Sequence, residues 1–418
     1  MKKIFRILLL SFPFLHTLFF KIKAWRSGQV SQYPRPLHNE LSSVADVLYY
    51  AGWNMSYSNS TVHAHFEEAF AGYTGTRYAV AVNSGGTAIQ MLLRALGIKP
   101  GDEVVHQVDT CVANPFSVIN AFANPVFADI SPESFMLSKE SLASAITSNT
   151  RVIMPIHMWG YAEDLDMVSE VAGKNNLIVI EDSCLALGAE YRNRKSGSIG
   201  TAGIFSFGCI KPLQAGEGGM ITTNNESLAK ELKAMRAWGD RSAEFGIRDQ
   251  SQLSWNGRAS EIVMAVAHEQ FKKYPRLLQC VRENIEWFSQ RIQHLEGIRL
   301  KSANENCNPS YSQVVFEITD MERLPKNKLF SAMNARHVQY NHANFELLTS
   351  LSFFKNKTWK EWNVKGNTDY LDRNYTGEFP NARKVYQQSG FGIYRSHFES
   401  RKHTQRLISD LEACLRDA

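Results

Sequence analysis

The chain lacks a strong excess of charge of either sign. It has 46 Lys and Arg against 41 Asp and Glu, a net charge of +5 over 418 residues. No run of basic residues accompanies a nucleic-acid motif, which argues against a nucleic-acid partner. The six cysteines are scattered and form no C-x-x-C pair. We therefore expect neither a structural zinc site nor any other metal centre, and a reducing compartment such as the cytoplasm is favoured.

Long hydrophobic runs are also missing. The longest candidate, Ile7 to Phe20, is shorter than the roughly 20 residues of a transmembrane helix, and polar residues interrupt it. Three basic residues flank it on each side, and no small-x-small cleavage site follows. We interpret residues 1–30 as a leader that packs on the fold or stays loose. Peripheral contact of residues 1–26 with the inner membrane face is the second interpretation, and secretion the third.

The composition is that of a globular protein, with 44% hydrophobic and 21% charged residues. Between residues 40 and 285, short apolar runs alternate with amphipathic helical stretches such as Ala88–Leu96. This alternation predicts an α/β domain with a largely parallel sheet covered by helices on both faces. The predicted strands are Tyr78–Val82, one starting at Glu103–Val105, Pro125–Ala128, Val152–Ile156 and Ile178–Ile180.

The pattern changes in the C-terminal third of the chain. Residues 286–418 predict a smaller α+β domain with a strand at Val314–Ile318 and a closing helix at Arg406–Leu415. Within these residues, a predicted helical stretch through Trp287–Leu295 comes before the strand and the closing helix. Residues Phe353–Thr376 have weak periodicity and predict a long loop that is a candidate for lining a site.

Three segments of the larger domain can carry chemistry. The turn Asn83–Thr87 joins a strand to a helix, and its glycines and free N–H groups suit a phosphate, although an ordinary turn has the same composition. The strand at Val179 ends in Glu181 and Asp182, where α/β sheets bind ligands, although a solvated strand end is as common. Lys211 lies among apolar and glycine residues, where an amine can lose its proton and attack a carbonyl. A surface lysine with its stem on apolar residues is the alternative.

Together these segments resemble the pyridoxal-phosphate-dependent sugar aminotransferases of the DegT/DnrJ/StrS family, which have the fold type I architecture. The resemblance runs from Phe66 to Tyr274, about half the chain, with the motifs in the family's order. The matching motifs are Phe66-Glu67, Tyr73–Gly75, Ser84–Leu92, Pro100–Val104, Pro125–Asp129, Pro155–Gly160, Glu181-Asp182, Ser206–Lys211, Gly216–Gly219 and Trp255–Arg258.

The resemblance implies a cofactor, pyridoxal 5'-phosphate, and roles for two catalytic residues. Lys211 would hold the cofactor aldehyde covalently and, once displaced by the amino donor, would move the proton between substrate and cofactor. Asp182 would pair with the pyridine nitrogen and keep it protonated, so that the ring can accept negative charge.

The resemblance also implies the remaining contacts. Gly86, Thr87 and Ser206 would hold the phosphate, and Asn256 would reach it across the interface of a homodimer with shared active sites. The large domain would hold a seven-stranded sheet, and the small domain would help to close the site. His342 is our candidate for a substrate contact, with an ordinary loop histidine as the alternative.

Two positions depart from the family pattern. Cys111 stands where the family usually has an aromatic ring stacked on the cofactor, and Leu185 stands where Gln or His often touches the ring. Both changes would weaken cofactor binding or alter its reactivity, but neither removes a group that the reaction needs.

The function implied by the resemblance is transfer of an amino group from glutamate or glutamine to a keto sugar. The acceptor would be a nucleotide-linked keto-deoxyhexose used in surface-glycan, O-antigen lipopolysaccharide or secondary-metabolite biosynthesis. A keto-cyclitol acceptor is the near alternative. A sugar dehydratase is disfavoured because that branch has His where this chain has Lys211. A regulatory protein that binds the cofactor without efficient turnover is the alternative from another class.

Overall fold

The computed structural model describes residues 38–51, 61–239, 254–341, 347–356, 358 and 379–418. The leader, most of the predicted loop at 353–376 and His342 therefore lie outside the described residues. Among the helices that are described, none combines the length and the apolar character needed to cross a membrane.

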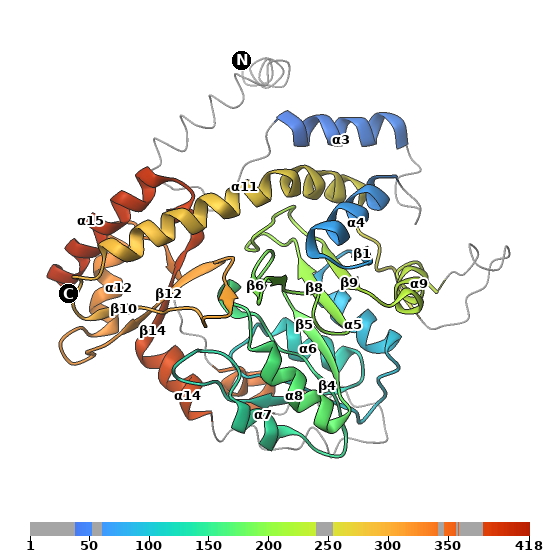
Figure 1. The fold of residues 1–418 in the computed structure, drawn as a ribbon, viewed down its shortest axis with the longest axis horizontal. Coiled ribbons are helices and arrows are strands. Elements are labelled where there is room, and N and C mark those ends of the chain that lie inside the picture. The colour runs from blue at the N-terminus through green and yellow to red at the C-terminus, as the bar shows by residue number, and fades with distance from the viewer. Residues whose placement is uncertain (1–37, 52–60, 240–253, 342–346, 357, 359–378) are drawn as a thin grey trace.

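A seven-stranded sheet in the order β1-β9-β8-β5-β4-β2-β3 lies at the centre of the fold (Figure 1). The pairs from β8 to β3 are parallel, and β9 runs antiparallel to both of its neighbours. This confirms the predicted α/β fold with its largely parallel, seven-stranded sheet. The strands are β1 (Tyr78–Val82), β2 (Glu103–Gln107), β3 (Asn124–Ala128), β4 (Thr150–Ile153), β5 (Ile178–Asp182), β8 (Ala202–Ser206) and β9 (Gly219–Thr223).

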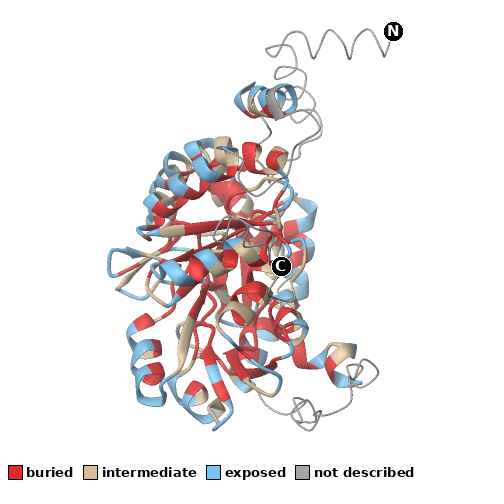
Figure 2. Ribbon diagram, turned by 90° about the vertical axis from the view of Figure 1, so that its right-hand side faces the viewer, coloured by how far each residue is buried: buried red, intermediate tan, exposed pale blue. Residues whose placement is uncertain are grey.

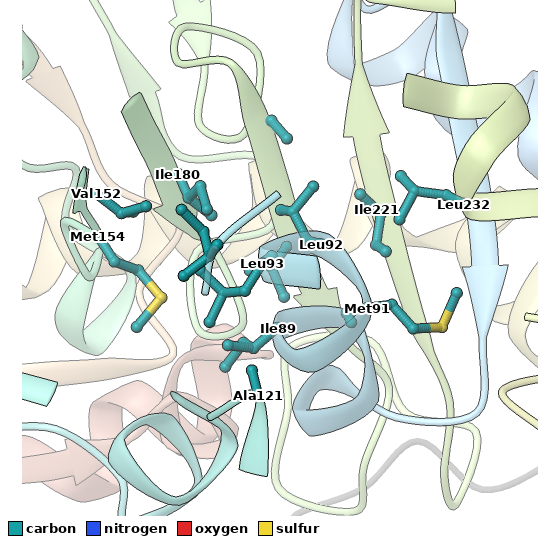
Figure 3. Packing of buried hydrophobic residues seen from close by; sticks show 14 of the residues in the cluster. Ile89, Met91, Leu92, Leu93, Ala121, Val152, Met154, Ile180, Ile221 and Leu232 are labelled. Carbon is teal, nitrogen blue, oxygen red and sulfur yellow. The ribbon is translucent and has the colours of Figure 1, made fainter. Parts of the chain in front are cut away.

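Helix α5 (Gly85–Ala95) shows why the sequence folds in this way. The hydroxyl of Ser84 accepts the backbone N–H of Thr87 at 3.0 Å and so caps the helix. Its apolar residues recur at helical spacing, and Ile89, Leu92 and Leu93 point toward the sheet (Figure 3). The other helices around this sheet are α4 (Thr61–Thr74), α6 (Ala113–Asn120), α7 (Lys139–Ala145), α8 (Leu165–Asn175) and α9 (Glu226–Met235).

The C-terminal part has an antiparallel four-stranded sheet in the order β10-β12-β14-β13. Its strands are β10 (Ile298–Leu300), β12 (Gln313–Ile318), β13 (Tyr340–Asn341) and β14 (Gly390–Tyr394). The helices are α12 (Lys326–Ala335), α13 (Ser352–Lys355), α14 (Pro380–Arg383), a π-helix η5 (Lys384–Ser389) and α15 (Arg401–Asp417). A small sheet of β6 (Glu190–Tyr191), β7 (Arg194–Lys195) and β11 (Cys307–Asn308) links the two parts.

A single long helix, α11 (Glu261–Arg291), connects the two cores. Its first half packs with Phe66 and Phe205 of the large sheet's core, whereas Val281 and Phe288 pack in the core of the four-stranded sheet. The predicted domain boundary at residues 285 and 286 falls inside this helix. Helix α3 (His38–Ala51) lies along α11, where Glu40 pairs with Lys273 at 2.5 Å (Figure 1). Buried residues fill the interior of the molecule, and exposed residues lie on its outer helices and loops (Figure 2).

Candidate functional site

The carboxyl ends of the parallel strands bring the predicted site residues to one edge of the sheet. β5 ends at Asp182 and β8 at Ser206, and the two strands are neighbours. β1, which lies on the far side of β9, leads into α5, so that Gly86 and Thr87 begin their helix at the same edge. Ligands in open α/β sheets bind at this edge.

Asp182 is held by two donors and is 4% exposed. Its Oδ1 accepts the backbone N–H of Cys184 at 2.9 Å, and its Oδ2 accepts the side-chain amide of Asn114 at 2.6 Å. Asn114 also donates to the hydroxyl of Thr110 at 3.0 Å. The carboxylate is therefore oriented before any ligand binds. Sequence reasoning missed Asn114; the available signal was a polar side chain in the first turn of the helix after Cys111.

Glu181, directly before Asp182, is fully buried, and its carboxylate is held by neighbouring backbone and side-chain donors. Its carboxylate accepts the backbone N–H groups of Gly197, Ile199 and Gly200 at 2.6–2.8 Å and Nε2 of His157 at 3.0 Å. Burial alone would raise the pKa of Glu181, but these hydrogen bonds outweigh it, and the pKa lies below its usual range. Nδ1 of His157 accepts the backbone N–H of Glu163 at 3.0 Å, which leaves Nε2 as the ring donor to Glu181. The second acid thus fixes the strand end that presents Asp182.

The first turn of α5 forms a tight cradle at Gly85 and Gly86. A Cβ at Gly85 would lie 3.1 Å from both Sγ of Cys184 and Cβ of Ser206, and one at Gly86 would lie 3.2 Å from the hydroxyl of Ser117. The first N–H groups of a helix have no intrahelical acceptor and attract anions. With the Ser206 hydroxyl beside it, the cradle fits a phosphate group.

Lys211 lies between β8 and β9 and is half-buried. Its backbone N–H donates to the carbonyl of Gly208 at 3.1 Å. A pocket joins it to residues of the C-terminal part, among them Tyr394, Arg395 and Glu399. Arg395 also donates to the carbonyl of Pro212 at 2.9 Å, so the C-terminal part holds the segment next to the lysine.

Lys211 lies near the thiol of Cys184. Burial raises the pKa of Cys184 well above its usual value, the nearby charge of Asp182 raises it further, and Lys211 acts in the opposite direction. Cys184 is therefore a neutral thiol at this edge of the sheet. An acid to face a ring nitrogen, an amine to bind an aldehyde and a cradle for a phosphate make this edge fit pyridoxal 5'-phosphate.

The remaining predicted residues lie around this edge. Cys111 is exposed, on the segment between β2 and α6. Leu185 is partly buried against the apolar cluster that contains Ile156 and Trp159. Asn256 is exposed beside the start of α5: its carbonyl accepts from the side chain of Asn83 at 3.2 Å. Only His342 lies outside the described residues.

Residues 38–374 match the profile of the DegT/DnrJ/EryC1/StrS aminotransferase family. The chain belongs to this family, whose members are aminotransferases. It is 40% identical over 233 residues to the GDP-perosamine synthase of Caulobacter vibrioides, a match that covers 55% of this chain and 62% of that protein. It is 34% identical over 220 residues to the L-glutamine:2-deoxy-scyllo-inosose aminotransferase of Streptomyces fradiae, with 52% of each chain covered.

Solved structures share the fold over nearly the whole chain. PseC of Helicobacter pylori, an aminotransferase involved in the biosynthesis of pseudoaminic acid, is 20% identical with a TM-score of 0.80 and covers 92% of this chain and 98% of its own. Spr1654 of Streptococcus pneumoniae, solved in its PLP form, is 22% identical with a TM-score of 0.78 and covers 92% and 97%. The C-terminal part thus keeps the family fold.

Proposed function

We propose that this protein is a pyridoxal 5'-phosphate-dependent aminotransferase that moves an amino group from glutamate or glutamine to a keto sugar. The observation that carries the proposal is the meeting of Asp182, Lys211 and the α5 cradle at one sheet edge. Family membership and the PLP form of Spr1654 support the cofactor.

When bound, the cofactor supplies an electron-accepting ring that stabilises negative charge on the substrate carbon. The carboxylate of Asp182, already oriented by Cys184 and Asn114, would pair with the ring nitrogen and keep it protonated. The Nζ of Lys211 would hold the aldehyde and, once displaced, would carry a proton to and from the substrate. The N–H group of Gly86 and the hydroxyl of Ser206 would bind the phosphate, and the N–H of Thr87 would join them by exchanging its capping contact with Ser84.

The acceptor we favour is a nucleotide-linked keto-deoxyhexose for a surface glycan, because a GDP-perosamine synthase is among the relatives. A keto-cyclitol is the second candidate, supported by the inosose aminotransferase. The protein would work in the cytoplasm as a homodimer, with Asn256 of each subunit reaching the partner's phosphate. Asn256 is exposed in the single chain, as a contact with a partner subunit requires.

A regulatory cofactor-binding protein is a candidate from another class. The chain is 32% identical over 232 residues to a pleiotropic regulatory protein of Geobacillus stearothermophilus, a match covering 61% of that protein. Cys111 would lower cofactor affinity in either case, because a thiol cannot stack on the ring as an aromatic side chain does. Leu185 would lower it as well, because its apolar side chain cannot make the polar contact that Gln or His makes with the ring.

The decisive measurement is the visible absorption spectrum of the purified protein with pyridoxal 5'-phosphate, before and after adding glutamate. A band that forms and then bleaches with glutamate supports the aminotransferase. A band that ignores both glutamate and glutamine supports the regulatory protein, and absence of a band overturns the cofactor. Lys211→Ala should remove the band and turnover together, while Lys233→Ala, on the surface of α9, should change neither.

Contact of residues 1–26 with the inner membrane face is tested separately. A chain lacking these residues should keep its activity and lose binding to vesicles that contain anionic phospholipid. Equal vesicle binding with and without the leader would contradict the proposed membrane contact.

A further inference from the structure

A buried series of side-chain hydrogen bonds connects the C-terminal part with the edge of the large sheet. The hydroxyl of Tyr386, on the π-helix η5, donates to Oδ2 of Asp109 at 2.5 Å and accepts Nε1 of Trp159 at 3.0 Å. The rings of Tyr386 and Trp159 stack at a centroid distance of 6.1 Å. All three side chains are at most 4% exposed.

The surroundings of Asp109 disfavour its charge. Burial raises the pKa of Asp109 to about 8, the hydrogen bond from Tyr386 lowers it, and the carboxylate of Asp129 raises it. The carboxyl of Glu163 also faces Asp109, and burial raises the pKa of Glu163 to about 8. Burial keeps the pKa of Tyr386 well above its usual value, so its hydroxyl remains a donor. The contact is a neutral hydrogen bond in a dry environment, where it is strong.

Asp109 is joined to the cofactor edge through its own segment. The next residue, Thr110, accepts a hydrogen bond from Asn114, and Asn114 donates to Asp182. Cys111 follows Thr110 and is exposed. The anchor at Asp109 and the donor to Asp182 therefore lie five positions apart, at the two ends of one short segment.

We propose that Asp109 and Tyr386 are a positioning pair that fixes the segment Asp109–Asn114 from the C-terminal part, and so sets the orientation of Asp182 and the space above Cys111. For the cofactor this inference rests on the proposed function. For the position of the segment it does not, because the hydrogen bonds exist in the protein alone. Neither residue touches the reacting atoms: both act through Asn114.

The test uses the reactivity of Cys111 in the full-length protein without cofactor. Cys209 is the other exposed thiol, so all variants carry Cys209→Ser, and the rate of reaction with a disulfide reagent then reports Cys111. Tyr386→Phe removes the hydroxyl and leaves two buried polar groups without their partner. We expect the Kd for pyridoxal 5'-phosphate to rise about tenfold, for a buried hydrogen bond of ordinary strength, and the thiol rate to rise as the segment around Cys111 loosens.

Two further variants separate positioning from general stability. Tyr191→Phe removes a Tyr–Asp hydrogen bond of 2.8 Å at the start of α8, away from this segment, and should change neither quantity. Asp109→Asn keeps an oxygen that accepts from Tyr386, so its thiol rate should equal that of the wild type. Asp109→Leu has no such oxygen and should behave as Tyr386→Phe.

An unchanged thiol rate in Tyr386→Phe, or an equal rise in Tyr191→Phe, would overturn the inference even if the melting temperature falls. A raised thiol rate with no change in the Kd for pyridoxal 5'-phosphate would overturn the claim that the pair sets the orientation of Asp182 for the cofactor. If the wild-type protein binds no pyridoxal 5'-phosphate, the proposed function fails, and the thiol rates still decide whether the pair positions the segment.

Discussion

The side-chain amide of Asn114 donates a hydrogen bond of 2.6 Å to Oδ2 of Asp182, although the two residues are 68 positions apart. Its other N–H is occupied by Thr110, so Asn114 cannot turn away without losing two contacts. The strength of this contact comes from the charge of the acceptor, since hydrogen bonds to charged groups stabilise more than neutral ones.

Asn114→Ala should weaken binding of pyridoxal 5'-phosphate by about tenfold, because a hydrogen bond to a charged group contributes about 1.5–3 kcal/mol and water replaces part of it. The measurement is a titration of cofactor absorbance. Asn120→Ala, at the exposed end of the same helix, is the matched control and should leave the Kd unchanged. Equal affinities in all three proteins would show that Asn114 does not orient Asp182 for the cofactor.

Glu181→Gln should lower the free energy of unfolding by about 3 kcal/mol, the usual cost of breaking a buried charged network on one side. The amide would place an N–H group where the carboxylate accepts three backbone N–H groups. Urea unfolding measures the loss. Glu226→Gln, on the surface of α9, should cost less than about 1 kcal/mol.

The Glu181→Gln variant also tests how the stability of the folded protein depends on pH. Because the pKa of Glu181 is lower in the folded protein than its usual 4.5, its stabilising contribution is complete above pH 4.5 and is lost as the pH falls through the folded value. The stability gap between wild type and Glu181→Gln should therefore narrow in acid. A gap that stays constant from neutral pH into acid would contradict the ionised, hydrogen-bonded state of Glu181.

Asp109 should affect the pH dependence of stability in the direction opposite to Glu181, and Asp109→Asn tests this. The folded protein holds a proton on Asp109 up to about pH 8, whereas the unfolded chain releases it near pH 3.8, so wild-type stability falls as the pH rises between these values. The Asn variant lacks this decline and should gain on the wild type from pH 5 to about pH 8. Glu163 titrates over the same range, so Glu163→Gln and the double variant are needed to separate the two contributions.

Gly85→Ala should reduce both cofactor affinity and stability, because its methyl group would crowd Cys184 and Ser206 at 3.1 Å. Overpacking of this kind costs about 1–3 kcal/mol. Gly173→Ala, in the exposed part of α8 with open space around it, should instead stabilise the protein by about 0.5–1 kcal/mol. Thermal unfolding and cofactor titration of the two variants check both signs. A Gly85→Ala protein with native affinity would exclude a tight phosphate cradle.

The sequence was sufficient to predict five of the seven strands of the large sheet, because a strand buried on both faces is typically a short apolar run; β8 and β9 were not among the predicted strands. Tyr78–Val82 and Ile178–Ile180 are such runs, and the structure has strands at both, the second extended to Asp182. It was also sufficient for the order of the motifs. The length of α11 was less accessible, because Pro275 normally ends or kinks a helix, yet the helix runs on to Arg291.

The side-chain pairs of the site could not be predicted in the same way. Asp109 and Tyr386 are 277 positions apart, and nothing local in either segment points to the other. Such pairs depend on how the π-helix packs against the large sheet, which only the tertiary structure determines. The resemblance predicted Asp182 and Lys211 because their chemistry is tied to motifs, whereas Asn114 and Tyr386 act only through neighbours.

Helix α11 has a consequence for how this chain unfolds. Because Phe271 lies in one core and Phe288 in the other, neither core can lose its packing while the helix remains intact. We expect the two halves to melt in a single calorimetric transition. A fragment cut at the predicted boundary would leave Val281 and Ile285 uncovered and prone to aggregation. Exchange of C-terminal parts between relatives should therefore be made with the whole of α11 on one side of the junction.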